Sequence, residues 1–156
     1  MAWGAGAVEG RATLAGVGMV RLRWTGEGLQ FVAETAYGSP VSVGGDSDGL
    51  GAKPSDLLPV SLAACTAYDV VVILGKQRQD LRGLEVVVSS TQDPDPPWTF
   101  RAIHTTFLLR GEVDLRKAEK AVALAESKSC AVAATLRPVV ELTHSVQVHP
   151  VTDAGA

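Results

Sequence analysis

Two short runs near the start of the chain alternate apolar and polar side chains, the pattern of strands with one solvated face. Val20–Trp24 carries Arg21 and Arg23 between its apolar residues, and residues 29–34 repeat the alternation after a glycine-containing turn. Together they predict a hairpin. Residues 39–43 predict a third short strand at a sheet edge, because Pro40 cannot donate to a ladder.

A long helix is predicted over residues 53–79. Pro54 suits its first turn, and Ser55 and Asp56 are placed to accept hydrogen bonds from the free backbone N–H groups there. Pro59 should bend or loosen this start, because its ring and missing N–H disturb a regular helix.

The second half of the chain predicts two strands, two helices and a last strand, in that order. Their ranges are 84–90, 98–109, 115–125, 130–136 and 140–148. Asp114 should cap the first of these helices and Ser129 the second. Strands that come in runs, not singly between helices, indicate an α+β class with mostly antiparallel strands.

Length and charge narrow this further. A chain of 156 residues, 46% apolar and 20% charged, is typical of one globular domain, here 1–156 with a Gly/Ala-rich extension over residues 1–18. The 14 Lys and Arg against 17 Asp and Glu leave no basic excess for a phosphate backbone, so nucleic acid is not expected as a partner. The first residues lack a secretory pattern, so we expect a cytoplasmic protein.

The stretch 57–74 has 14 apolar residues of 18, close to the length of a membrane span. Pro59, Ser61, Thr66 and Asp69 interrupt it. A helix apolar on all sides but too interrupted for lipid is usually buried in a core or at an oligomer interface. We therefore expect a homodimer and no membrane.

Cys65 and Cys130 are the only two cysteines, and their contexts differ. By number and spacing they fit neither a disulfide scaffold nor a zinc site, which leaves two unrelated core residues or a redox pair. At the start of its predicted helix, and with Lys128 near by, Cys130 is expected to have a lowered pKa. Cys65 lies mid-helix with Asp69 one turn further on, so a thiolate there needs a cation from elsewhere, with Arg21 and Arg23 as candidates.

The remaining chemistry-bearing residues give no catalytic motif. His104, His144 and His149 lack metal-ligand spacing, and His144 lies in the apolar phase of the last strand, which favours a core or edge histidine with its hydrogen bonds satisfied. No cofactor is expected.

The two cysteine segments resemble those of the OsmC/Ohr family, the osmotically inducible protein C and organic hydroperoxide resistance proteins. The likeness rests on Gly51-x-Lys53-Pro54-Ser55-Asp56-Leu57-Leu58, Leu62-Ala63-Ala64-Cys65-Thr66, Asp69-Val70, Ile73-Leu74, residues 119–124, Ser129-Cys130-Ala131-Val132 and Leu136. It extends from about Val20 to Val148. The resemblance implies mostly antiparallel sheets packed on a long central helix, in an intertwined homodimer.

The same resemblance implies a thiol peroxidase that reduces organic hydroperoxides. Cys65 matches the attacking cysteine and Cys130 the resolving one, with a dithiol as reductant. In the best-characterised members an arginine and a glutamate polarise the attacking thiol, the glutamate directly following the helix-opening proline. Here Ser55 has that place, and the acid is Asp56, one residue later. This arrangement is similar to that of a divergent OsmC-like subgroup.

Three functions therefore remain open. The first is the peroxidase, with Cys65, Cys130 and Asp56 as its catalytic residues and Arg21 or Arg23 as thiolate-activating residue. The second is a non-catalytic OsmC-like dimer that binds a ligand or senses redox state. The third is a purely structural role for both thiols.

Overall fold

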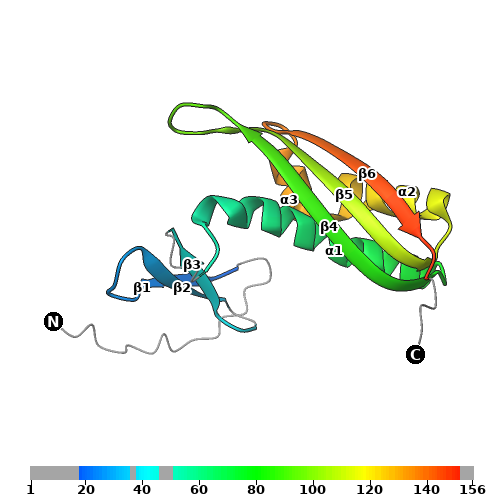
Figure 1. The fold of residues 1–156 in the computed structure, drawn as a ribbon, viewed down its shortest axis with the longest axis horizontal. Helices are drawn as coiled ribbons and strands as arrows, with labels where there is room; N and C mark the ends of the chain where they lie inside the picture. The colour runs from blue at the N-terminus through cyan, green and yellow to red at the C-terminus, as the bar shows by residue number, and fades with distance from the viewer. Residues whose placement is uncertain (1–17, 36–37, 46–50, 152–156) are drawn as a thin grey trace. The chain divides into compact units, whose positions relative to one another are not determined.

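The computed structural model describes residues 18–35, 38–45 and 51–151, and the predicted extension over residues 1–18 lies almost wholly outside these ranges (Figure 1). The chain forms two compact units, one up to Pro54 and one from Ser55 onward. The prediction of one domain over the whole chain stays a prediction.

The first unit is a three-stranded antiparallel sheet. It contains β1 (Val20–Trp24), β2 (Gln30–Thr35) and β3 (Val41–Gly44), in the order β1-β2-β3. The register pairs Leu22 with Ala33 and Trp24 with Phe31, so the apolar residues of the alternating pattern share one face. The predicted hairpin and edge strand are confirmed.

Gly51, after β3, has a backbone conformation that residues with a side chain rarely adopt. Ala52 bridges to Val43 beside β3, and the chain reaches it through Gly51, whose φ is 110°. A Cβ at this position would lie 2.8 Å from the Ser42 carbonyl oxygen. Only glycine therefore fits at this position, which explains why the segment leading into the long helix begins with Gly51.

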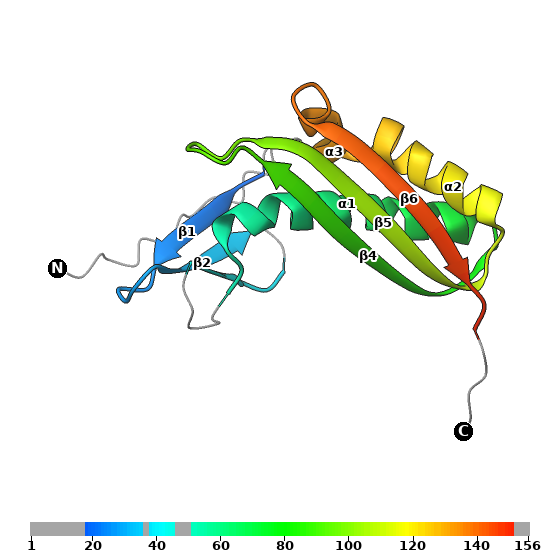
Figure 2. The same cartoon turned by 45° about the horizontal axis from the view of Figure 1, so that its top comes forward.

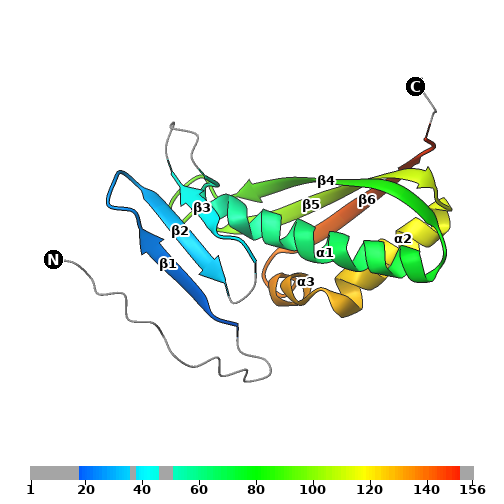
Figure 3. The ribbon, with the colours of Figure 1, turned by 90° about the horizontal axis from the view of Figure 1, so that it is seen from below.

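The second unit is a sheet with helices packed on one face (Figures 2 and 3). The strands are β4 (Asp80–Gln92), β5 (Phe100–Glu112) and β6 (Glu141–His149), in the order β4-β5-β6. The β4–β5 pair is an antiparallel hairpin, whereas β6 runs parallel to β5, because two helices intervene and return the chain to the starting edge. Most pairings are antiparallel, as predicted, and the α+β class is confirmed.

The long central helix α1 spans Leu57–Lys76, and Pro54–Asp56 forms a 3₁₀ turn before it. Pro59 lies in the first turn of α1, and the effect predicted for it remains a prediction. The expected capping by Asp56 is wrong: in the described structure its side chain accepts no cap hydrogen bond, because the tighter turn holds Asp56 itself in a helical conformation. The helix also ends earlier than predicted, before Arg78, whose φ is 55°.

The second helical region contains an unpredicted π-helical turn. Asp114 caps α2 (Leu115–Leu124) as expected, by accepting a hydrogen bond from the Lys117 N–H. A π-helical segment, Ala125–Ser129, follows and leads into α3 (Ala131–Leu136). The cap of α3 is Cys130, not Ser129, because the wider π turn includes Ser129.

The largest core cluster lies between the sheet and the helices. Its fully buried members are Val70 and Leu74 from α1, Phe107 and Leu109 from β5, Ala118, Ala121 and Val122 from α2, and Ala125. On α1 the buried residues recur every fourth position, at Leu62, Thr66, Val70 and Leu74. One stripe of α1 therefore faces the interior, which fixes the helix rotation.

Truncation of the core should reveal this packing. Leu109 has 0% exposure, so we expect Leu109→Ala to lower the free energy of unfolding by about 2–5 kcal/mol through lost burial and a residual cavity. Leu124→Ala is the matched control, because Leu124 is 41% exposed and should lose about 1 kcal/mol or less. Urea denaturation measures both, and equal losses would contradict the assignment of the core.

Candidate functional site

A second core cluster brings the two cysteines together. It joins Leu62 of α1, Ile103 of β5 and the buried Cys130, with Cys65 packed against it. Both thiols are free, and they are close enough for Cys65 to contribute to the raised pKa of the Cys130 thiol. Residues 65 positions apart in the sequence thus form one thiol pair.

The two elements present their thiols differently. Cys65 directly precedes Thr66, a member of the buried stripe, and is itself half-buried. Cys130 is 2% exposed and caps α3, where its Sγ accepts a hydrogen bond from the Ala133 N–H at 3.3 Å. Cys65 is therefore the more accessible thiol of the pair.

The expectation of a lowered pKa at Cys130 is wrong. Burial raises the pKa of the Cys130 thiol to about 11, and the hydrogen bond with Cys65 contributes in the same direction. The hydrogen bond from the Ala133 N–H lowers it, but by less. Desolvation therefore outweighs the helix start, and Cys130 is a protonated thiol at neutral pH.

Of the other predicted site residues, only Asp56 belongs to the same unit as the thiols. Asp56 is exposed and lies nine positions before Cys65, a separation of about 13 Å along a helix axis. Arg21 and Arg23 lie on β1 in the first unit, and Arg23 forms an ion pair with Glu34 on β2. The roles predicted for Asp56 and the two arginines remain predictions.

An apolar groove runs along the other side of α1. Its volume is about 990 Å³, and α1 and β4 supply its walls. The lining residues are Asp56, Pro59, Val60, Ala63, Ala64, Ala67, Tyr68, Val71, Val72, Leu84, Val86, Val88 and Ser90. Several are strongly exposed in the single chain, Tyr68 at 73% and Val60 at 56%. An apolar surface of this kind marks a binding or association site.

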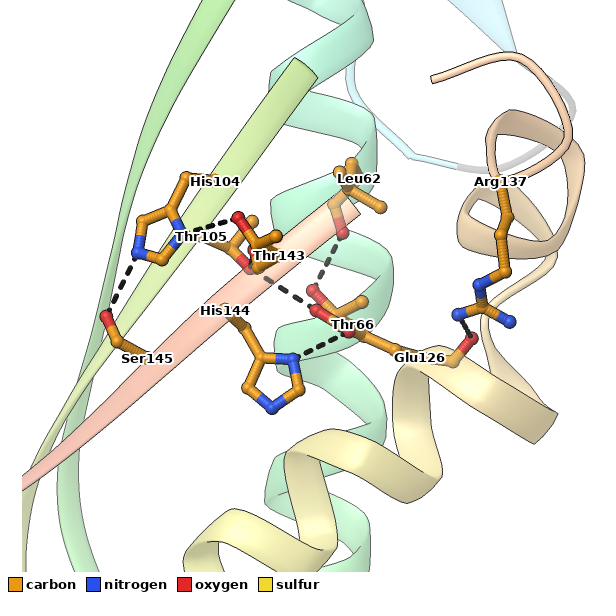
Figure 4. A network of polar contacts seen from close by, with 9 residues as sticks. All are labelled: Leu62, Thr66, His104, Thr105, Glu126, Arg137, Thr143, His144 and Ser145. Carbon is orange, nitrogen blue, oxygen red and sulfur yellow. Dashed lines mark hydrogen bonds and ion pairs between the residues drawn. The ribbon is translucent and has the colours of Figure 1, made fainter. Parts of the chain in front are cut away.

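Sequence reasoning missed a buried carboxylate four residues before Cys130. Glu126 in the π turn is 8% exposed and accepts hydrogen bonds from Thr105 Oγ1 and His144 (Figure 4). His144 is therefore hydrogen-bonded on the edge strand β6, as expected from its place in the apolar phase. A signal existed, because Glu126 follows the buried Val122 by four positions and so lies on the same helix face.

Within residues 18–35, 38–45 and 51–151, no group of three or more His, Cys, Asp or Glu side chains is placed to hold a metal ion. The helical span Pro54–Lys76 is long and apolar enough to cross a membrane. That is weak evidence, because core helices of soluble proteins have the same length and composition.

The chain is similar to proteins of one family along most of its length. A model of the OsmC-like protein family matches residues 45–145. Protein YhfA of Escherichia coli K12 is 36% identical over 130 residues, which cover 82% of this chain and 96% of YhfA.

Solved structures give the same result. A hypothetical protein from Aquifex aeolicus VF5 matches with a TM-score of 0.78 at 28% identity, over 87% of this chain and 98% of that one. The organic hydroperoxide resistance protein OsmC from Legionella pneumophila matches with a TM-score of 0.62 at 18% identity, over 85% and 97%. The second likeness is one of fold.

The raised pKa of Cys130 predicts its reactivity toward alkylating agents. In Cys65→Ser protein, where Cys130 is the only thiol, we expect alkylation by iodoacetamide to keep accelerating up to pH 10, because burial, the largest cause of the raised pKa, remains. The same protein unfolded in urea should instead titrate near the ordinary value of about 8.5. A plateau below pH 9 in folded protein would contradict the raised pKa.

Proposed function

The chain belongs to the OsmC-like protein family, and from that premise we propose that it is a thiol-dependent peroxidase that reduces organic hydroperoxides. Cys65 is the attacking cysteine, Cys130 the resolving one, and a dithiol is the reductant. The enzyme acts as a cytoplasmic homodimer.

One observation carries this proposal: the two thiols are neighbours and differ in accessibility. Cys65 is half-buried and open to a small oxidant, whereas Cys130 is buried directly beside it. The pKa of about 11 keeps Cys130 protonated and therefore a poor nucleophile toward peroxide. The order of events follows, with Cys65 reacting first.

The chemistry balances in three steps. The Cys65 thiolate attacks the distal oxygen of the hydroperoxide, the O–O bond breaks, and the alkoxide leaves as alcohol after taking up a proton. The Cys130 sulfur then displaces hydroxide from the Cys65 sulfenic acid, and the thiol proton leaves with that hydroxide as water. Finally, the external dithiol reduces the Cys65–Cys130 disulfide by exchange.

A cation is needed to favour the Cys65 thiolate, because Asp69 lies one turn along the same helix. We assign this role to Arg21 in preference to Arg23, since Arg23 is already paired with Glu34. Asp56, exposed at the groove, takes the place of the glutamate that accompanies the arginine in the best-characterised members.

The homodimer is supported by apolar surface that a single chain leaves exposed. In the second unit this surface is the α1–β4 groove, and in the first it is one face of β1, where Val20, Leu22 and Trp24 are each more than half exposed. Monomeric soluble proteins rarely expose apolar surface of this extent. A second copy of the chain would cover it.

The groove also favours a second candidate function, the binding of an apolar ligand without catalysis. Its lining is mostly aliphatic, with polar groups at Asp56, Tyr68 and Ser90. Ligand pockets have this composition and a volume of about 300–1,000 Å³. In that case the cysteines would oxidise too slowly for turnover.

Single-cysteine variants separate these functions. With one equivalent of an organic hydroperoxide, wild-type protein should form a Cys65–Cys130 disulfide that mass spectrometry detects. Cys65→Ser should abolish peroxide consumption, because it removes the nucleophile. Cys130→Ser should consume one equivalent, stop at the sulfenic acid, and proceed to sulfinic acid when a second equivalent is added, because no thiol resolves the sulfenic acid.

Two outcomes would contradict the peroxidase. Equal residual turnover in both variants would show that the cysteines do not have distinct roles. Thiols that stay free in wild-type protein, together with an apolar compound retained through purification, would favour the ligand-binding alternative.

The oligomeric state tests whether a second copy of the chain covers the exposed groove. Light scattering at micromolar concentration should give twice the chain mass of 16.3 kDa. Tyr68→Glu should shift the protein toward monomer, because it places a charge on a surface that a partner would bury. Glu119→Gln, an exposed change on α2, is the control, and a monomeric wild-type protein would refute the homodimer.

A further inference from the structure

The π turn just before Cys130 is a local irregularity with a geometric consequence. The Cys130 N–H donates to the Ala125 carbonyl at 2.8 Å, five residues back, where a regular helix bonds four residues back. One residue more in the turn changes the direction of the following side chains by about 100°. Such turns are rare and occur frequently at functional sites.

Three elements hold Glu126, the second residue of this turn (Figure 4). Its carboxylate accepts hydrogen bonds from Thr105 Oγ1 on β5 at 3.3 Å and from His144 Nδ1 on β6 at 2.8 Å. Its backbone carbonyl accepts one from the Arg137 guanidinium, beyond the end of α3, at 2.7 Å. Thr105 and His144 are register partners on the face of the sheet that packs against the helices.

These contacts specify the position of the turn. An unpaired carboxylate in the interior is strongly unfavourable, so Glu126 is tolerated only where Thr105 and His144 meet it. The sheet is rigid at this point, because Thr105 is 1% exposed and flanked by the buried Ile103 and Phe107. The carboxylate therefore ties the turn, and Cys130 four residues later, to the sheet.

We propose that Glu126 is a positioning residue for the resolving thiol, holding the π turn so that Cys130 Sγ lies against Cys65. This inference rests on the proposed peroxidase cycle. Glu126 acts on one step, the displacement of hydroxide from the Cys65 sulfenic acid by the Cys130 sulfur, which forms the S–S bond and releases water. A held thiol attacks as an intramolecular neighbour at high effective concentration.

The first test needs no peroxide. Wild-type protein and Glu126→Ala are equilibrated in dithiothreitol redox buffers, and the Cys65–Cys130 disulfide is quantified by mass spectrometry. Glu126→Ala should make the disulfide about tenfold less favourable, which raises its reduction potential by about 30 mV. Glu119→Ala, at an exposed glutamate of α2, is the matched control and should leave the potential unchanged.

The second test separates the steps of the cycle. Reduced protein is mixed with an organic hydroperoxide and quenched at intervals with a sulfenic-acid trap. Glu126→Ala should lose the Cys65 thiol at a rate within about twofold of wild type, but form the disulfide about tenfold or more slowly and accumulate sulfinic acid. A structural defect alone would slow both steps.

A conservative variant tests positioning against charge. In Glu126→Gln the amide oxygen can still accept from Thr105, and the amide nitrogen can donate to His144 in its other neutral tautomer. We expect the thiol–disulfide equilibrium constant of this variant to lie within about threefold of the wild-type value. Thr105→Val removes one hydrogen bond with little change of shape, should give an intermediate shift, and decides the question if Glu126→Ala does not fold.

Two results would overturn the assignment. The first is that Glu126→Ala leaves both the reduction potential and the ratio of disulfide to sulfinic acid unchanged. The second is that Glu126→Gln shifts the reduction potential as much as Glu126→Ala does. Failure of the wild-type protein to react with hydroperoxide would refute the peroxidase only, since the redox-buffer experiment still measures how well the thiols are placed.

Discussion

The packing of one stripe of α1 against the sheet is the constraint on which the rest of the second unit depends. Leu62, Thr66, Val70 and Leu74 are buried at intervals of four, so the rotation of the helix is fixed. The Thr66 hydroxyl fits this stripe because it donates to the Leu62 carbonyl at 2.8 Å. With the stripe fixed, Cys65 packs with the cluster that contains Cys130, and the alanine-rich surface that includes Ala63, Ala64 and Ala67 lines the groove.

The elements whose apolar residues recur at a regular spacing could be predicted from the sequence. Alternation gave the hairpin of β1 and β2, and helical spacing after Asp114 gave α2, since each pattern reflects a face that is buried. The parallel β6 and the π turn Ala125–Ser129 had no such signal. Strand direction depends on where the two helices return the chain, and the π turn depends on a tertiary contact of Glu126, so neither is a local property.

The candidate site likewise has features that could be predicted from the sequence and features that could not. The pairing of Cys65 with Cys130 came from the family resemblance, because spacing in sequence cannot place two helices side by side. The reactivity expected for Cys130 failed for a physical reason: its position at a helix start was readable, but its burial at 2% exposure was not, and burial dominates the pKa. Arg21, Arg23 and Asp56 were named with the help of the same resemblance, and no local sequence pattern places them at Cys65.

An asymmetric thiol pair needs opposite properties at its two positions. In the proposed cycle the attacking thiol must be reachable, as the half-buried Cys65 is, while the resolving thiol must not react before the sulfenic acid forms. Burial protects Cys130 from oxidants, but it also raises the pKa and so lowers the fraction of reactive thiolate at neutral pH. Proximity is the compensation available to a buried thiol, because an intramolecular attack needs little thiolate when the partner is held in contact. A rigid turn before Cys130 is therefore a requirement of the arrangement, and the buried carboxylate of Glu126 provides the rigidity.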